Sequence, residues 1–170
     1  EMSSRGLGDV YKRQHQDPLT RLPNRLALNS KVEGWLSNNT AFGIIILDLD
    51  HFKAINDTYG HDAGDLLLRE FSRIGRSVIR PSDTIGRWGG EEFLVLCALD
   101  DTDALGAIAE RLQQTVAAQH FVYRQQKIRF TISAGFALRE ANETFASLFH
   151  RADQALYQAK SSGRNQVKAA

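Results

Sequence analysis

The order of the expected strands and helices restricts the fold of this chain more than any other feature of its sequence. Apolar patterning predicts a strand, a helix, two strands, a helix and a strand, with one further helix at each end. The expected strands are 42–47, 85–88, 92–97 and an alternating stretch over 128–139. This is the order of the ferredoxin-like arrangement. We therefore expect an α/β (α+β) fold, in which helices flank a central, partly antiparallel sheet of about five strands.

The expected helices repeat apolar residues every three or four positions, which is the spacing of one helix face. Asn24 is a good cap for the first helix, the second follows Gly64, and Gly163 is a stop signal for the last. The apolar positions are Leu28, Val32, Trp35 and Leu36; Leu67, Phe71, Ile74 and Val78; Leu105, Ile108, Leu112 and Val116; and Leu148, Ala152, Ala155 and Ala159.

Composition and charge exclude several classes of protein. The chain has 170 residues, which favours one domain, and 21 Lys and Arg against 20 Asp and Glu give a net charge of +1. A surface that binds duplex nucleic acid normally shows a basic excess, so we expect no such partner. The longest apolar run, 41–47, is too short to cross a membrane. Cys97 is the only cysteine, which rules out an intramolecular disulfide and permits a reducing compartment.

The chain divides into two segments of different character. Residues 1–16 show neither a helical stripe nor strand alternation, and we expect a linker, a tag-like segment or a remnant there. Residues 17–168 form the expected domain. We expect this domain to be cytoplasmic, which leaves any membrane anchor to a sensory part outside this sequence.

Acidic residues should converge at one edge of the sheet. The crossover makes the first two strands parallel, and the third strand fills the gap between them, antiparallel to both. Asp48 and Asp50 at the end of the first strand then meet Glu91 and Glu92 of the hairpin. Carboxylates this close resist ionising together, and a divalent cation resolves their repulsion. Oxygen ligands favour Mg²⁺ over Zn²⁺. The alternative is that these acids are only solvated.

The hairpin between the second and third strands contains Gly89 and Gly90. A glycine pair is typical of a tight hairpin. Two residues without Cβ also let the phosphates or base of a ligand approach the backbone closely. The sequence contains no Walker P-loop and no G-x-G-x-x-G motif, so the common nucleotide cradles are absent.

Five motifs stand in order along the chain. Residues 17–25 read DPLTRLPNR, and residues 47–65 read LDLDHFKAINDTYGHDAGD. Residues 87–93 read RWGGEEF, and TISAG at 131–135 and ADQALYQAKSSGRN at 152–165 complete the set. Together they resemble the GGDEF family of diguanylate cyclases, in its GGEEF variant, from Asp17 to about Val167. Members of that family fold around a palm-like sheet and join two GTP into cyclic di-GMP with release of two pyrophosphates.

The resemblance implies a metal-dependent reaction. Asp48, Glu91 and the Leu49 carbonyl would hold Mg²⁺, or Mn²⁺ in its place. Glu91 would also accept the proton of the attacking 3′-hydroxyl, and Glu92 would join the catalytic set as a further ligand.

The resemblance also implies a set of substrate contacts. Asn56 and Asp65 would read guanine, because a carboxylate accepts from the N1–H and N2 amino group of guanine and repels the N1 lone pair of adenine. Lys53, Lys160 and Arg164 would bind phosphates, although a basic helix end is commonly only solvated. The remaining contacts would come from Phe52 at the wall of the site and from Gly89 and Gly90.

A second, inhibitory site is implied by Arg80 and Asp83, which match the R-x-x-D motif of the family at the correct offset from Gly89. Arg111 matches a secondary arginine of a facing domain. An arginine fork can hold O6 and N7 of a guanine of the product. The alternative is a simple surface ion pair between Arg80 and Asp83.

The expected protein is therefore a Mg²⁺-dependent diguanylate cyclase in bacterial second-messenger signalling. Each domain would bind one GTP, so catalysis would need an antiparallel homodimer, and cyclic di-GMP would act as product and feedback ligand. Two alternatives remain open. A receptor that does not catalyse would use Arg80 and Asp83 alone, and a related cyclase would join guanine and adenine nucleotides, against which Asp65 argues.

Overall fold

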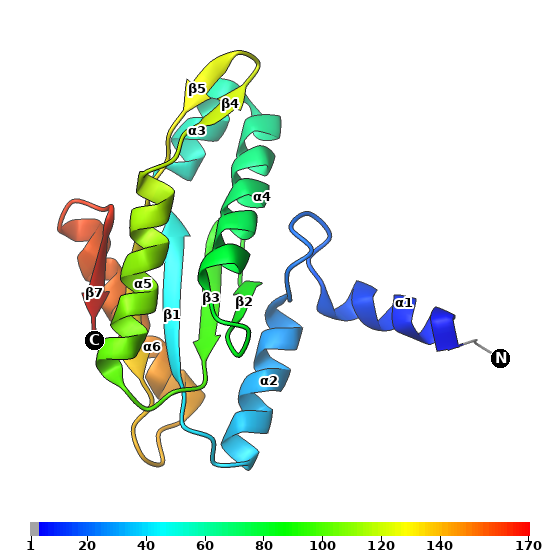
Figure 1. The fold of residues 1–170 in the computed structure, drawn as a ribbon, viewed down its shortest axis with the longest axis vertical. Helices are drawn as coiled ribbons and strands as arrows, with labels where there is room; N and C mark the ends of the chain where they lie inside the picture. Colours follow the sequence, from blue (N-terminus) through cyan, green and yellow to red (C-terminus); the bar gives the residue numbers. More distant parts are fainter. Residues whose placement is uncertain (1–3) are drawn as a thin grey trace.

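The computed structural model describes residues 4–170, which form a sheet covered by helices on both faces (Figure 1). The helices are α1 (Ser4–His15), α2 (Arg25–Ser37), α3 (Phe52–Tyr59), α4 (His61–Val78), α5 (Thr102–Ala117) and α6 (Phe145–Ser161). The strands are β1 (Gly43–Leu49), β2 (Thr84–Arg87), β3 (Glu92–Cys97), β4 (Phe121–Tyr123), β5 (Gln126–Ile128), β6 (Ile132–Leu138) and β7 (Gln166–Ala169). Among residues 4–170, no helix combines the length and apolar character needed to cross a membrane.

The main sheet has the strand order β2-β3-β1-β6-β7, which confirms the expected fold class. β3 lies between β1 and β2 and pairs antiparallel with both, as the crossover rule predicts. β6 pairs antiparallel with the other side of β1, and β7 adds a parallel edge strand beside β6. The carboxyl end of β1 therefore lies beside the hairpin that joins β2 and β3.

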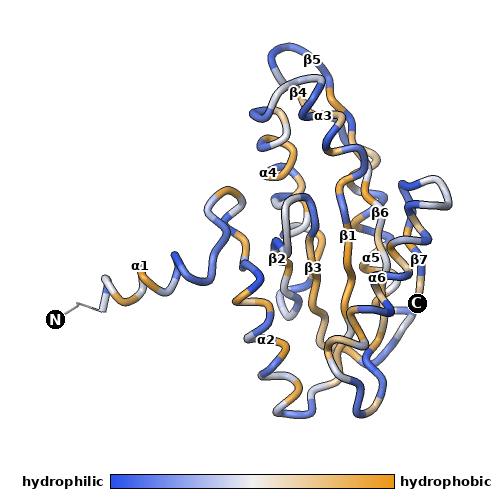
Figure 2. The backbone as a smooth tube through the Cα atoms, turned by 180° about the vertical axis from the view of Figure 1, so that it is seen from behind, coloured by the Kyte–Doolittle hydropathy of each residue, from blue (hydrophilic) through white to orange (hydrophobic). Residues whose placement is uncertain are grey.

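Successive residues of β1 contribute to two different apolar clusters. Ile45 and Leu47 belong to a cluster with residues of α4 and α5, whereas Ile44 and Ile46 belong to a cluster with residues of α2 and α6. Because helices cover both faces of the sheet, β1 and β3 are apolar along most of their length, apart from acids at their adjoining ends, and they are largely orange in Figure 2. Burial on both faces fixes the register at the end of β1, where the expected site lies.

Gly135 lets α6 lie directly on β6. An added Cβ there would lie 2.3 Å from the Ala152 carbonyl oxygen and 2.3 Å from the Leu156 nitrogen, both backbone atoms of α6. We expect Gly135→Ala to lower the free energy of unfolding by about 3 kcal/mol, the upper end of overpacking costs. Urea unfolding measures this effect. Gly34→Ala, in α2 with open space around it, is the control and should gain about 0.5–1 kcal/mol. Equal stability of Gly135→Ala and the wild type would contradict the close packing.

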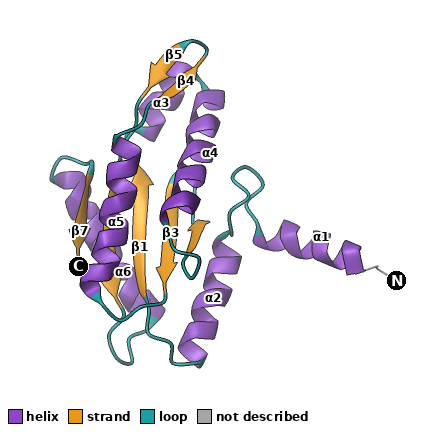
Figure 3. Ribbon diagram, viewed as in Figure 1, coloured by secondary structure: helices purple, strands orange, loops and turns teal. Residues whose placement is uncertain are grey.

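The structure differs from the sequence-based expectation in the first segment. Residues 4–15 are helical, where we expected no regular structure, and α1 projects away from the sheet (Figure 3). Leu7, Val10 and Tyr11 do follow helical spacing and were overlooked, although no residue of α1 is buried. The backbone of Asn24 donates to the His15 carbonyl and ties the end of this helix to the start of α2.

Four further elements, α3, β4, β5 and β7, were not expected as separate elements. α3 precedes α4 and contains no buried residue, and β7 is a short, half-buried edge strand. The expected continuous strand over 128–139 is wrong, because Ile128 ends a separate hairpin of β4 and β5 and β6 begins at Ile132. Arg124 and Gln125 form the turn of that hairpin at positive φ, without the glycine that usually reveals such a turn.

Candidate active site at the end of the central strand

Asp48 and Glu92 lie directly opposite each other on β1 and β3. Like charges in this position destabilise a sheet unless a cation compensates them. Lys160 from the end of α6 provides one cation, since its Nζ forms an ion pair with Oδ2 of Asp48. The other carboxylate oxygen of Asp48, Oδ1, is buried and has no hydrogen-bond partner.

The surroundings of Glu92 make its ionisation unfavourable. Burial is the main cause, followed by the negative charges of Asp48 and Asp153, and together they raise the pKa of Glu92 to about 7 despite the opposing effect of Lys160. The end of β1 therefore carries more acidic groups than the one lysine can neutralise.

A cavity of about 200 Å³ opens at this end of β1. Asp48 and Leu49 line it from the strand end, and Glu91 lines it from the hairpin. The backbone nitrogen of Leu49 donates to the Glu91 carbonyl at 3.3 Å, which holds the hairpin against the strand. The other lining residues are Asp50, His51, Phe52, Lys53, Lys160 and Arg164. The structure thus brings together most of the residues expected at the metal and the phosphates.

Asp50 does not present a free carboxylate to this cavity. Its oxygens accept hydrogen bonds from the Thr131 hydroxyl at 2.7 Å, the Ser133 hydroxyl at 2.6 Å and the Asn165 backbone nitrogen at 3.0 Å. Asp50 therefore joins the end of β1 to β6 and to the loop after α6. Asp50 lines the same cavity as Asp48 and Glu91, as expected, but hydroxyl partners distant in sequence occupy its carboxylate oxygens.

Asn56 lies on α3 and Asp65 on the neighbouring α4, and neither residue lines the cavity at Asp48. The Asn56 amide packs directly against Gly64, where a Cβ would lie 1.8 Å from Oδ1 of Asn56. That oxygen is buried and has no hydrogen-bond partner. Asp65 is half-buried, and no hydrogen bond or ion pair joins its carboxylate to the residues that the structure describes. The turn from α3 to α4 thus presents an unpartnered amide oxygen and an unpartnered carboxylate.

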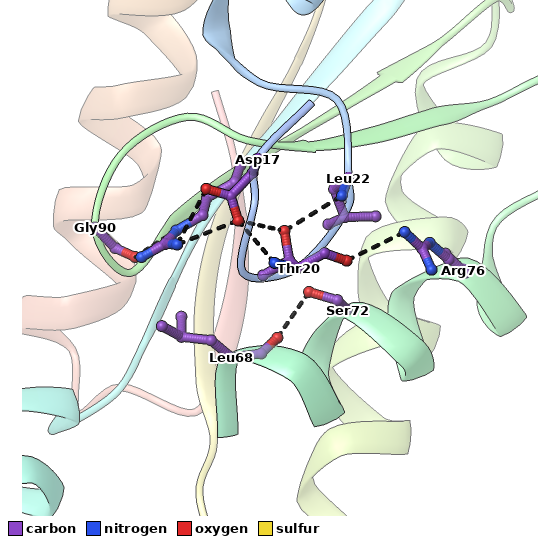
Figure 4. A network of polar contacts seen from close by, with 8 residues as sticks. Asp17, Thr20, Leu22, Leu68, Ser72, Arg76 and Gly90 are labelled. Atoms are coloured by element: carbon purple, nitrogen blue, oxygen red, sulfur yellow. Dashed lines mark hydrogen bonds and ion pairs between the residues drawn. The ribbon is translucent and has the colours of Figure 1, made fainter. Parts of the chain in front are cut away.

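The glycine hairpin is fixed by contacts that the sequence analysis missed. Arg87 donates to the Gly90 carbonyl at 2.7 Å and to both carboxylate oxygens of Asp17 at 3.2 Å. Thr20 donates to Asp17 through its backbone nitrogen and its hydroxyl, as Figure 4 shows. Gly89 and Gly90 line a surface depression with Trp88 and do not line the cavity at Asp48. The sequence signal for this contact was that Asp17 and Arg87 each belong to one of the five motifs.

Arg80 and Asp83 form an ion pair before β2. The guanidinium of Arg80 donates to both oxygens of Asp83, the shortest contact being 2.7 Å, and the Asp83 side chain is fully buried while that of Arg80 is 39% exposed. Arg111 on α5 donates to the carbonyl of Val78 at 2.7 Å, and Val78 is two residues before Arg80 in the sequence. The bonds of Asp83 raise the pKa of Arg80 further, so this guanidinium is a permanent, half-exposed cation.

The donor set at Asp48 fits a hard divalent cation. In the part of the chain that the structure describes, Asp48 Oδ1 and Asn56 Oδ1 are the buried side-chain polar atoms without partners. An orphaned carboxylate oxygen beside Glu91 and the backbone of Leu49 offers oxygen ligands of the kind that Mg²⁺ binds. Within residues 4–170, no group of three or more His, Cys, Asp or Glu side chains has the geometry of a complete metal site. A cation here would need backbone or ligand oxygens as well.

Known proteins match the whole described fold. The family model "Diguanylate cyclase, GGDEF domain" matches residues 14–166. Diguanylate cyclase DgcP of Pseudomonas aeruginosa is 40% identical over 168 residues, covering 96% of this chain and 25% of that protein. Diguanylate cyclase A of Treponema denticola is 37% identical over 168 residues, covering 98% of this chain and 44% of that protein. The chain thus spans less than half the length of these relatives.

Solved structures agree with this match. The coiled coil and GGDEF domain of DgcB from Caulobacter crescentus, in complex with c-di-GMP, superposes with a TM-score of 0.91 at 31% identity. The match covers 98% of this chain and 91% of that one. Diguanylate cyclase SiaD of Pseudomonas aeruginosa, solved with its activator SiaC, gives a TM-score of 0.88 at 36% identity over 98% of this chain and 66% of that one.

Proposed function

This chain belongs to the GGDEF family of diguanylate cyclase domains, and from that membership we propose that it condenses two GTP into cyclic di-GMP and two pyrophosphates. One observation carries the proposal further than the family match does. The two orphaned buried oxygens belong to Asp48 and Asn56, one at the expected metal end of the site and the other at the expected base end. Product analysis after incubation with GTP and Mg²⁺ tests the proposal.

In this function Asp48, Glu91 and the Leu49 carbonyl hold Mg²⁺. The bound ion would neutralise the triphosphate and lower the pKa of the 3′-hydroxyl that attacks the α-phosphorus. The orphaned Asp48 Oδ1 and the position of Glu91 in the same cavity support this ligand set. Mn²⁺ satisfies the same oxygen donors.

The chain's own residues then position the substrate. Lys53 and Arg164 line the cavity without ion pairs to described residues, and they are available to the phosphate oxygens. Lys160 pairs with Asp48, the proposed metal ligand, and in this proposal also binds the phosphates. Glu91 accepts the proton of the 3′-hydroxyl, and Glu92, opposite Asp48, is the further ligand. Phe52 forms part of the wall, and Gly89 and Gly90 leave open space beside the hairpin.

The guanine base lies between α3 and α4 in this proposal. Oδ1 of Asn56 accepts from the base, and Asp65 accepts from the N1–H and the N2 amino group. The Asn56 amide packs against Gly64, the residue before Asp65, and the unpartnered Oδ1 of Asn56 supports this role.

Asp65→Ser is expected to weaken the preference for guanine. The substitution removes the carboxylate that repels N1 of adenine, so ATP should become a better competitor of GTP or a substrate. Rates with GTP, with ATP and with an equal mixture measure the preference. Asp62→Ser, at an exposed position earlier in α4, is the matched control. Unchanged discrimination in Asp65→Ser would mean that Asn56 or the wall of the pocket selects the base.

Catalysis needs a second copy of the domain. One bound GTP has no partner to attack, so two domains must face each other in an antiparallel homodimer. Cyclic di-GMP then acts at Arg80 and Asp83, with Arg111 contributed by a facing domain. The c-di-GMP complex of the related DgcB domain supports a product site in this family, and the half-exposed guanidinium of Arg80 supports its place here.

A further inference from the structure

A groove of about 520 Å³ lies between α4 and the loop that precedes α2. Four arginines line it, namely Arg21 from the loop and Arg69, Arg73 and Arg76 from α4, and we call it the arginine groove. It shares no lining residue with the cavity at Asp48. The proposed cyclase reaction uses none of these arginines.

The positive charge in the arginine groove is only partly compensated. The α4 arginines are spaced four and three residues apart, so they share one helix face, where like charges repel. Arg73 pairs with Glu70 at 2.9 Å, and Arg76 donates to the Thr20 carbonyl at 3.2 Å. No hydrogen bond or ion pair joins the side chains of Arg21 and Arg69 to residues 4–170. An anion in the groove would relieve this repulsion.

The backbone of Arg21 adds an independent observation. Its φ is 61°, in the left-handed region that glycine and asparagine adopt much more readily than arginine. The loop nevertheless carries a long cation here, and that cation faces the arginines of α4 across the groove. The loop is held by the bonds of Thr20 to Asp17 and of Arg76 to Thr20 shown in Figure 4. Arg21 is therefore presented from a fixed loop.

We propose that the arginine groove binds a small anion with two or three linked phosphates. Guanidinium groups hold phosphate oxygens in pairs of parallel hydrogen bonds, and four of them around one groove suit several phosphates better than one. The volume of the groove lies in the usual range for small-molecule sites. Leu19 supplies an apolar part of the wall. This binding needs no metal ion.

Calorimetric titration of tripolyphosphate into the chain, with a chelator present, tests the proposal. We expect Arg69→Gln with Arg73→Gln to weaken binding about tenfold or more, since two charge-assisted contacts are lost. Arg76 is left intact because it holds the Thr20 carbonyl. Arg129→Gln, at an exposed position elsewhere, is the control and should bind as the wild type does. Lys160→Gln reports any tripolyphosphate that binds in the cavity at Asp48 instead. Loss in Lys160→Gln with none in the double variant would overturn the proposal.

Lysine variants separate a shaped site from simple charge attraction. Arg69→Lys with Arg73→Lys keeps both charges and removes the paired donors, so we expect it to bind clearly more weakly than the wild type. Wild-type affinity in this variant would contradict a phosphate site and indicate only a positive surface. Circular dichroism of each variant checks that α4 is intact.

The source of the phosphates is decided by a second titration. ATP is the probe, because Asp65 is expected to exclude adenine from the catalytic pocket. Tighter binding of ATP than of tripolyphosphate would identify a nucleotide whose base rests on Leu19. Equal or weaker binding of ATP would identify an inorganic polyphosphate.

Discussion

Replacing Glu91 with glutamine is expected to reduce cyclase turnover by at least about 10². The glutamine keeps the shape of the side chain but removes the negative charge beside Asp48 and Leu49. It also cannot accept the proton of the attacking hydroxyl. Both losses act in the transition state, so kcat should fall more than the affinity for GTP. Initial rates of cyclic di-GMP formation in Mg²⁺ measure the effect.

The control for this prediction is Glu33→Gln. Glu33 is an exposed residue of α2 and does not line the cavity at Asp48. This substitution makes the same chemical change and should keep the wild-type rate. Since Glu91 is partly exposed, its substitution should leave the thermal midpoint almost unchanged. Near-normal turnover of Glu91→Gln would contradict the assignment of Glu91 to the metal and the proton.

Replacing Arg80 with alanine is expected to weaken the binding of cyclic di-GMP by about 1–3 kcal/mol, the scale for loss of one bidentate guanine contact. Initial turnover should stay largely intact, because the proposed product site shares no residue with the cavity at Asp48. Inhibition by product should be non-competitive with GTP, since the ligand holds the two active sites apart without entering the catalytic pocket.

Calorimetry of the wild type and Arg80→Ala with cyclic di-GMP measures this difference. The substitution also leaves the buried Asp83 with fewer partners, although the backbone nitrogen of residue 80 still donates to it. Thermal unfolding must therefore accompany the titration, and Arg129→Ala is the control for loss of an exposed arginine. Equal affinities for folded wild type and Arg80→Ala would show that Arg80 and Asp83 are only an ion pair.

The central elements of the fold were predictable because burial shaped their sequences. The hairpin at Gly89 and Gly90 fixed the pairing of β2 with β3, and the crossover rule placed β3 beside β1. Elements with little burial were not predictable in this way. α1 and α3 bury no residue, and β7 is a half-buried edge strand, so packing against the core left little trace in their sequences.

The candidate site was predictable as a set of residues but not as a set of contacts. The motifs identified Asp48, Glu91 and Lys160, yet the ion pair of Lys160 with Asp48 joins residues 112 positions apart. The contact of Arg87 with Asp17 spans 70 positions. Such contacts depend on the orientation of α6 over the sheet and on the path of the loop before α2. Neither is encoded in local periodicity.

Incubation of the chain with GTP and Mg²⁺, followed by chromatographic separation of the products, tests the central claim most directly. The protein concentration should be one at which sedimentation shows the dimer, because a monomer holds only one GTP. We predict one cyclic di-GMP and two pyrophosphates for every two GTP consumed, and none when Mg²⁺ is chelated. If the dimer leaves GTP unconverted and binds cyclic di-GMP tightly, the claim that the chain is a cyclase is contradicted, and the chain is a receptor.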